Sequence, residues 1–254
     1  MTNAIRYQPA NVKLRGLVRA LELERGRRVK VYGTSLPSGF SCPGALDCLS
    51  KADQYTGKIT DGSEMEFRCF MASIEAYSNS LRALVWNNFS ILRRAKTREA
   101  MVEALDAGFP ADADAVRPGI GGDFFNYNHF AAWMDVARRH PNVLVYCYTK
   151  SINYWVDFME REEIPHNMEI NGSEGGRYDS LLTEYGLKTA KVVFHPAEAV
   201  ALGLEVDHNE MHAIRPGPSF ALLIHGTQSK GSDAAAAIKQ LKLEGIEYAY
   251  RGKP

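Results

Sequence analysis

The 254-residue sequence has no net charge and no long apolar run. Its thirty basic side chains balance thirty acidic ones, which excludes the broad positive field that attracts a nucleic acid backbone. No apolar stretch is as long as a membrane span, which requires about 20 residues. The polar N-terminus lacks the apolar core of a signal peptide. We therefore expect a cytoplasmic protein that does not enter a membrane.

Cysteine is also scarce, because the chain has only four. Three of them, Cys42, Cys48 and Cys69, fall within 28 positions, which suits local metal capture better than a disulfide framework. No linker-like composition divides the chain. The sequence therefore predicts a single α/β domain over residues 1–254, in which residues 36–95 form a sub-region with a cysteine loop and a long helix.

The apolar pattern predicts strands that alternate with helices. An N-terminal helix lies within residues 1–28, and the long helix runs from Glu64 to Arg94 at helical spacing. The predicted strands cover residues 29–32, 115–120, 143–148, 168–170, 191–194 and 220–224. Such alternation indicates a parallel sheet with right-handed crossovers. We expect an incomplete parallel (β/α)6-like barrel with an N-terminal helix and a cysteine-bearing loop.

Polar residues follow nearly every predicted strand, at the end where parallel sheets bind ligands. The candidate catalytic residues at this barrel mouth are Asp123, Lys150, Asn171 and His225. The candidate cofactor-binding residues are Thr34, Ser173, Thr227 and Gln228. A loop at residues 172–177 contains three glycines that allow backbone to approach a ligand. The expected occupant is an unknown small molecule or anion, although solvated turns and salt bridges at the rim explain each cluster equally well.

The cysteine spacing favours an iron–sulfur cluster. Five residues separate Cys42 from Cys48 and twenty separate Cys48 from Cys69, so three thiolates could hold a [4Fe–4S] cluster with one open iron. A zinc site completed by His129, His195 or His225 is the rival interpretation, although the usual close cysteine pairs are absent. The third alternative is buried thiols without a metal. Cys147 lies within a predicted strand and is expected to pack in the core on the helix side.

Five short motifs carry a resemblance to a known family. They are Ser41-Cys42-Pro43-Gly44, Arg68-Cys69, Gly122-Asp123-Phe124-Phe125, Tyr148-Thr149-Lys150-Ser151 and His225-Gly226-Thr227-Gln228. The chain resembles the phage proteins called gene product eighty-eight, which implies a bacteriophage or prophage origin and the host cytoplasm as its location. It is more loosely similar to the partial barrels of radical S-adenosylmethionine enzymes. That likeness makes S-adenosylmethionine a candidate cofactor, against which the cysteine spacing counts.

Two functions follow as hypotheses. The first is an iron–sulfur enzyme of unknown substrate, whose open iron faces the barrel mouth. The second is a non-enzymatic phage regulatory module that binds a host protein or nucleic acid, with a structural cluster or zinc. Local basic side chains support the second hypothesis, namely Arg15, Arg19, Arg25, Arg27, Arg28, Lys30, Arg93, Arg94, Lys96 and Arg98.

Overall fold

Seven strands form one sheet in the computed structural model, which describes residues 4–11 and 14–246. The strands are β1 (Gln8–Pro9), β2 (Val31–Ser35), β5 (Ala115–Gly121), β6 (Leu144–Thr149), β7 (Met168–Ser173), β8 (Thr189–Val193) and β9 (Phe220–Leu223). They lie side by side in this same order, and every pairing is parallel except that of β1 with β2. A separate hairpin joins β3 (Ser50–Ala52) to β4 (Ile59–Asp61) inside the cysteine loop.

Helices lie before, between and after the parallel strands. They are α1 (Arg15–Arg25), α2 (Phe70–Tyr77), α3 (Asn79–Arg94), α4 (Arg98–Asp106), α5 (Tyr127–Arg139), α6 (Ile152–Met159), α7 (Asp179–Glu184), α8 (Pro196–Ala201) and α9 (Asp233–Leu243). The N-terminal helix predicted within residues 1–28 is α1, and residues 1–3 and 12–13 of that range lie outside the described part of the chain.

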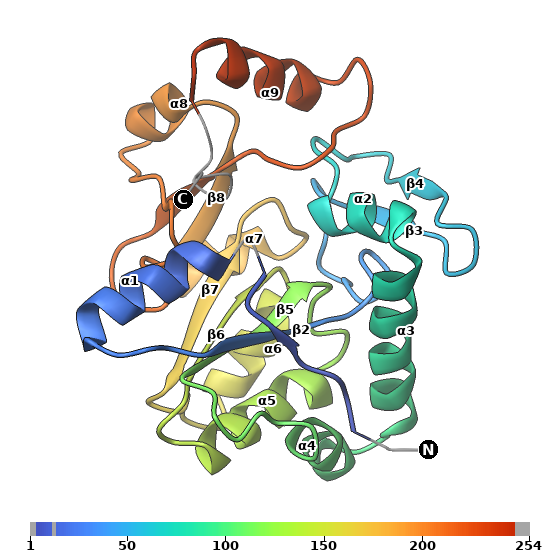
Figure 1. The fold of residues 1–254 in the computed structure, drawn as a ribbon, viewed down its shortest axis with the longest axis vertical. Helices are drawn as coiled ribbons and strands as arrows, with labels where there is room; N and C mark the ends of the chain where they lie inside the picture. Colours follow the sequence, from blue (N-terminus) through green and yellow to red (C-terminus); the bar gives the residue numbers. More distant parts are fainter. Residues whose placement is uncertain (1–3, 12–13, 247–254) are drawn as a thin grey trace.

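The two faces of the sheet are covered by different elements. Apolar side chains from α3 to α7 form one core with Val116, Val145 and Cys147, which confirms that Cys147 packs on the helix side. The opposite face packs against α1, α2 and residues 211–214. A smaller core lies between the last two strands and the helices α8 and α9, which occupy the upper end of the molecule in Figure 1.

The α/β class and the mostly parallel sheet are confirmed, whereas the predicted barrel is not. Strands β1 and β9 are the two edges of the sheet, and no closed barrel is found among the described residues. The sheet therefore remains open, and the predicted six-step barrel detail is not confirmed.

The long helix predicted from Glu64 to Arg94 is wrong, because two helices occupy this range. Ser78 has extended backbone angles and separates α2 from α3, and its side chain accepts a hydrogen bond from the Leu81 amide at 3.3 Å. A serine that caps an amide in this way favours a helix start over a helix interior. Cys69 is the N-cap residue of α2 and does not lie within its first turns.

Candidate functional site

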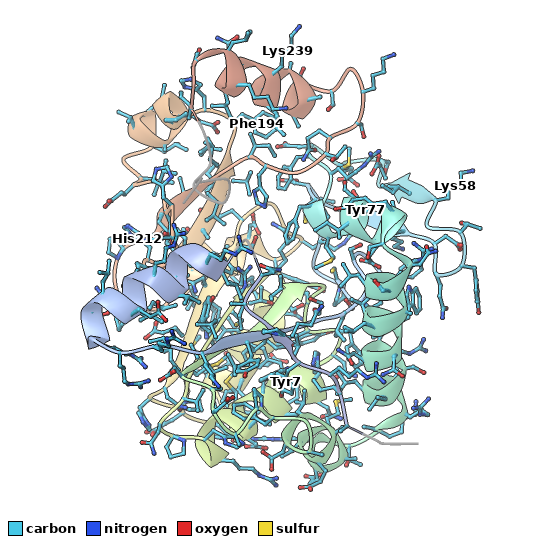
Figure 2. The ribbon with its side chains drawn as sticks, in the orientation of Figure 1. Tyr7, Lys58, Tyr77, Phe194, His212 and Lys239 are labelled. Atoms are coloured by element: carbon cyan, nitrogen blue, oxygen red, sulfur yellow. The ribbon has the colours of Figure 1, made fainter. Side chains whose placement is uncertain are left out.

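A cleft of about 230 Å³ opens beside the carboxyl ends of β7 and β8. Parallel sheets commonly bind ligands at this end of their strands. The residues that line the cleft are Asp47, Glu66, Phe67, Glu174, Gly175, Lys191, Val192, Phe194 and Glu198. Phe194 is labelled in Figure 2 and lies below α9. The cleft therefore lies where the architecture of the sheet favours a ligand-binding site.

Three segments that are distant in sequence meet at Asp47, on one wall of the cleft. The Asp47 amide donates to the Gly175 carbonyl at 3.0 Å, and the Asp47 carbonyl accepts from the amides of Glu66 and Phe67 at 2.8 and 3.1 Å. Gly175 has a φ of +84°, and a Cβ at this position would collide with the Asp47 carboxyl. The glycine thus allows the turn after β7 to approach the cysteine loop.

Strand β8 supplies the opposite wall through alternate residues. The Glu174 carboxylate accepts from the Thr189 hydroxyl at 2.7 Å and lies 3.2 Å from the Lys191 ammonium. Phe194 packs edge-to-face on Phe67, with ring centroids 6.4 Å apart. These contacts combine a charged wall with an aromatic one.

The electrostatic balance of the cleft is negative. Asp47, Glu66, Glu174 and Glu198 contribute four carboxyl groups, and Lys191 contributes the one ammonium among the lining residues. The Glu198 carboxylate also accepts from the Phe194 amide at 2.8 Å, which keeps it at the start of α8. A site with this charge attracts a cation more strongly than an anion.

Asp123, a predicted catalytic residue, is buried and holds backbone together. Its carboxylate accepts from the Phe124 amide at 2.7 Å, the Thr149 hydroxyl at 2.6 Å and the Lys150 amide at 2.8 Å. Burial raises the pKa of Asp123, and these hydrogen bonds partly oppose that rise. The side chain joins the end of β5 to the end of β6, and catalysis by Asp123 stays a prediction.

The other predicted catalytic residues also contact backbone. The Lys150 ammonium donates to the Ser173 carbonyl at 3.1 Å and to the Glu174 carbonyl. Asn171 is fully buried and donates to the Cys147 and Ala213 carbonyls at 3.1 and 2.9 Å. Their roles in a reaction stay predictions.

His225 lies with two of the predicted cofactor-binding residues in the turn after β9. Its ring is 5.2 Å from that of Phe70. Gln228 accepts from the Arg68 amide at 2.7 Å and donates to the Arg68 and His225 carbonyls, while the Thr227 carbonyl accepts from Ser73 at 2.8 Å. This turn is thereby fastened to the beginning of α2.

The remaining cofactor-binding candidates lie apart from each other. Thr34 is buried in β2 beside a small apolar cavity of about 10 Å³. Ser173 ends β7, next to Glu174 and hence to the cleft. Cofactor binding by these residues stays a prediction, as does S-adenosylmethionine as the ligand.

The iron–sulfur cluster predicted at Cys42, Cys48 and Cys69 is wrong. Across residues 4–11 and 14–246, no group of three or more His, Cys, Asp or Glu side chains is placed to hold a metal ion, which also overturns the zinc alternative. No disulfide joins the cysteines in this part of the chain.

Two of these thiols lie in surroundings that favour the protonated form. Burial, followed by the charge of Asp123, raises the pKa of Cys42 well above its usual value, and burial raises the pKa of Cys48 to about 12. Cysteine spacing in the sequence carried no information about this desolvation.

Most cleft residues were not among the predicted site residues. Glu174 and Gly175 belong to the loop at 172–177 that the sequence marked as able to approach a ligand, so a signal existed there. Lys191 and Glu198 carried no comparable signal, because one begins a predicted strand and the other lies in a short helix. Asp47 lies inside the cysteine loop, which we interpreted only through its cysteines.

The fold and the cleft define a class: an α/β protein with an open, mostly parallel sheet and an acidic site at its carboxyl edge. The chain belongs to the family described as Gene product 88, which it matches over residues 9–241. It is 27% identical over 125 residues to the Gene 88 protein of Mycobacterium phage L5. That alignment covers 45% of this chain and 46% of the phage protein. No solved structure matches the chain.

The phage family predicted from the five motifs is therefore confirmed. In the described ranges, none of the helices combines the length and apolar character needed to cross a bilayer. The cytoplasmic location stays a prediction, and so does the binding of a host protein or nucleic acid.

Proposed function

We propose that this protein binds a small molecule carrying an ammonium or guanidinium group in the cleft beside β7 and β8. The observation that carries the proposal is the cleft itself, which brings four carboxyl groups and one lysine together at the ligand-binding end of a parallel sheet. A cation would gain favourable electrostatic energy there, and charged partners form the stronger hydrogen bonds.

The size and the aromatic wall narrow the class of ligand. A water molecule takes about 30 Å³ of liquid volume, so a cleft of about 230 Å³ accommodates a small molecule rather than a polymer segment. The edge-to-face pair of Phe67 and Phe194 offers apolar contact to a short methylene chain. Lys191 occupies part of the acidic wall at Glu174, so a bound cation would compete with it.

A calorimetric titration with matched probes tests the proposal. We expect 1,4-diaminobutane to bind and succinate, a four-carbon dianion, not to bind. Glu174→Gln should weaken diamine binding about tenfold, equivalent to about 1.4 kcal/mol. Lys191→Gln should strengthen it, because the competing cation is removed.

Glu184→Gln is the control, since Glu184 is exposed on α7 outside the cleft lining. Failure of the diamine to bind would contradict the proposal. Equal weakening by Glu174→Gln and Glu184→Gln would show only a general charge effect, and would contradict it as well.

A further inference from the structure

A buried ion pair lies on the sheet face that α1 covers, with no residue in common with the cleft lining. Arg117 of β5 binds the Glu210 carboxylate, and their side chains are 5% and 1% exposed. Tyr146 of β6 donates its hydroxyl to the second oxygen of that carboxylate at 2.6 Å. A guanidinium and a phenol thus hold Glu210 in the way that a protein holds a bound carboxylate.

A second tyrosine completes this sheet-borne pocket. The Arg117 guanidinium lies 4.6 Å from the ring centroid of Tyr148 and 6.0 Å from that of Tyr146. The Tyr148 hydroxyl is buried and makes no hydrogen bond within the described part of the chain. Burial, and then the charge of Glu210, raises the pKa of Tyr148 well above its usual value, so this hydroxyl stays protonated. It is an unused donor beside an occupied carboxylate pocket.

The Glu210 carboxylate belongs to an irregular segment, whereas Arg117 and the two tyrosines belong to the sheet. Glu210 lies between α8 and β9 and has a φ of +63°, the only positive φ at a non-glycine position in the described ranges. A side chain in this conformation costs free energy, and burying a charge pair costs more than burying apolar residues of similar size. Such strain is typical of segments that switch between two arrangements.

Backbone contacts fix both ends of this segment. At one end the Asp207 amide donates to the Ala221 carbonyl of β9 at 2.9 Å. At the other, the Lys188 ammonium donates to the Arg215 carbonyl at 2.6 Å. Between these anchors, Asn209 packs against Gly16 of α1, and His212 is labelled near α1 in Figure 2. We call residues 208–214 the strap. Its opening must also break two hydrogen bonds inside it, from Lys188 to the His212 carbonyl and from Asn171 to the Ala213 carbonyl.

We propose that Arg117, Tyr146 and Tyr148 form a carboxylate-binding site that the chain occupies with its own Glu210. The strap opens when a carboxylate-bearing small molecule takes the place of that side chain. Glu210 is then an internal competitor, and its attachment to the chain gives it a high effective concentration in the closed form. This site is independent of the cation proposed for the cleft.

Chemical rescue tests the site. Glu210→Gly removes the carboxylate, relieves the positive φ and leaves a space shaped like propionate. We expect propionate to raise the melting temperature of this variant by about 3 °C in a saturable manner, and propionamide, its neutral isostere, to have no such effect. Wild type should need a far higher propionate concentration, because its own Glu210 competes for the site. Arg117→Met in the Glu210→Gly background should abolish the response. Absence of any propionate effect in a folded Glu210→Gly variant would overturn the proposal.

Hydrogen exchange tests the strap, and decides the matter even if Glu210→Gly does not fold. In Glu210→Gln we expect the amides of residues 208–214 to exchange about tenfold faster, while those of β5 and β6 keep wild-type rates. Glu184→Gln is the control, because Glu184 is exposed on α7, outside the strap. Equal loss of protection across the strap and the sheet would show that Glu210 only stabilises the core, and would overturn the proposal.

Discussion

At the scale of single residues, polar side chains at the strand ends form hydrogen bonds mainly with backbone groups. The Asp123 carboxylate accepts hydrogen bonds from two backbone amides and a hydroxyl, and the Lys150 ammonium donates to two backbone carbonyls. Backbone groups that leave the sheet need partners when they are buried, because an unpaired buried group costs about 1–3 kcal/mol. The same residue types that mark an active site in a sequence therefore also mark a well-satisfied strand end.

His129 provides a residue-scale prediction on pH. It lies in α5, its ring stacks near Phe125 with centroids 4.8 Å apart, and it accepts from the Trp133 indole at 3.3 Å. Burial lowers the pKa of His129 from 6.5 to about 3. Between these values the unfolded chain binds a proton that the folded chain does not, so this residue makes stability fall as the pH falls from 6.5 to 3.

We expect His129→Phe to flatten that loss by up to about 1.4 kcal/mol per pH unit, measured by urea unfolding at several pH values. Trp133→Phe is the matched control, since it removes the hydrogen bond but keeps the histidine. Its stability should be lower throughout, with the wild-type pH slope. Identical slopes for wild type and His129→Phe would contradict the assignment.

At the scale of elements, close backbone approach positions the cysteine loop against the sheet. The Gly44 carbonyl accepts from the Arg177 amide at 2.9 Å, and the isolated bridge between Ala45 and Gly176 lies beside it. A Cβ at Gly44 would collide with the Lys150 carbonyl at the end of β6. The loop can therefore reach the turn after β7 only because residue 44 has no side chain.

Gly44→Ala should lower the free energy of unfolding by about 2–3 kcal/mol, the typical cost of overpacking a rigid contact. We also expect the amides of residues 41–49 to lose hydrogen-exchange protection. Gly186→Ala is the control, because Gly186 has a φ of +59° but no atom near its Cβ position, so only the cost of about 1 kcal/mol for the backbone conformation applies. Equal effects of the two substitutions would argue against a close approach at Gly44.

At the scale of the whole molecule, opposite charges pair across elements. Arg25 and Arg27 both contact Asp114, and Lys30 lies 2.5 Å from Asp112. At the start of α4, Arg98 binds Asp135 of α5 and Glu162. These pairs use four of the basic side chains that supported nucleic acid binding, which leaves less positive charge for a phosphate backbone.

Duplex DNA binding should accordingly be weak. We expect fluorescence anisotropy with a labelled duplex to show little dependence on salt, in contrast to the slope of about −0.9 per neutralised phosphate for a true binder. Arg93→Glu combined with Arg94→Glu should leave the signal unchanged. A steep salt dependence in wild type that this double variant abolishes would instead support the nucleic acid hypothesis.

Periodicity and turn chemistry in the sequence were enough to predict the class of fold. The strands predicted near 115–120, 143–148 and 220–224 follow from local apolar spacing and lie close to the observed bounds. The phage family followed from short motifs. These features depend on residues that are close together in the sequence, so a local pattern is enough to predict them.

Tertiary structure alone decided the sites. The raised pKa of the Cys48 thiol comes from burial by the folded chain, and the cleft forms only where Asp47, Glu174 and Lys191 meet. Glu210 likewise finds Arg117 across 93 positions of sequence. Burial and charge pairing are sums over the whole fold, so no local pattern determines them, whereas helix and strand spacing is already present in the chain.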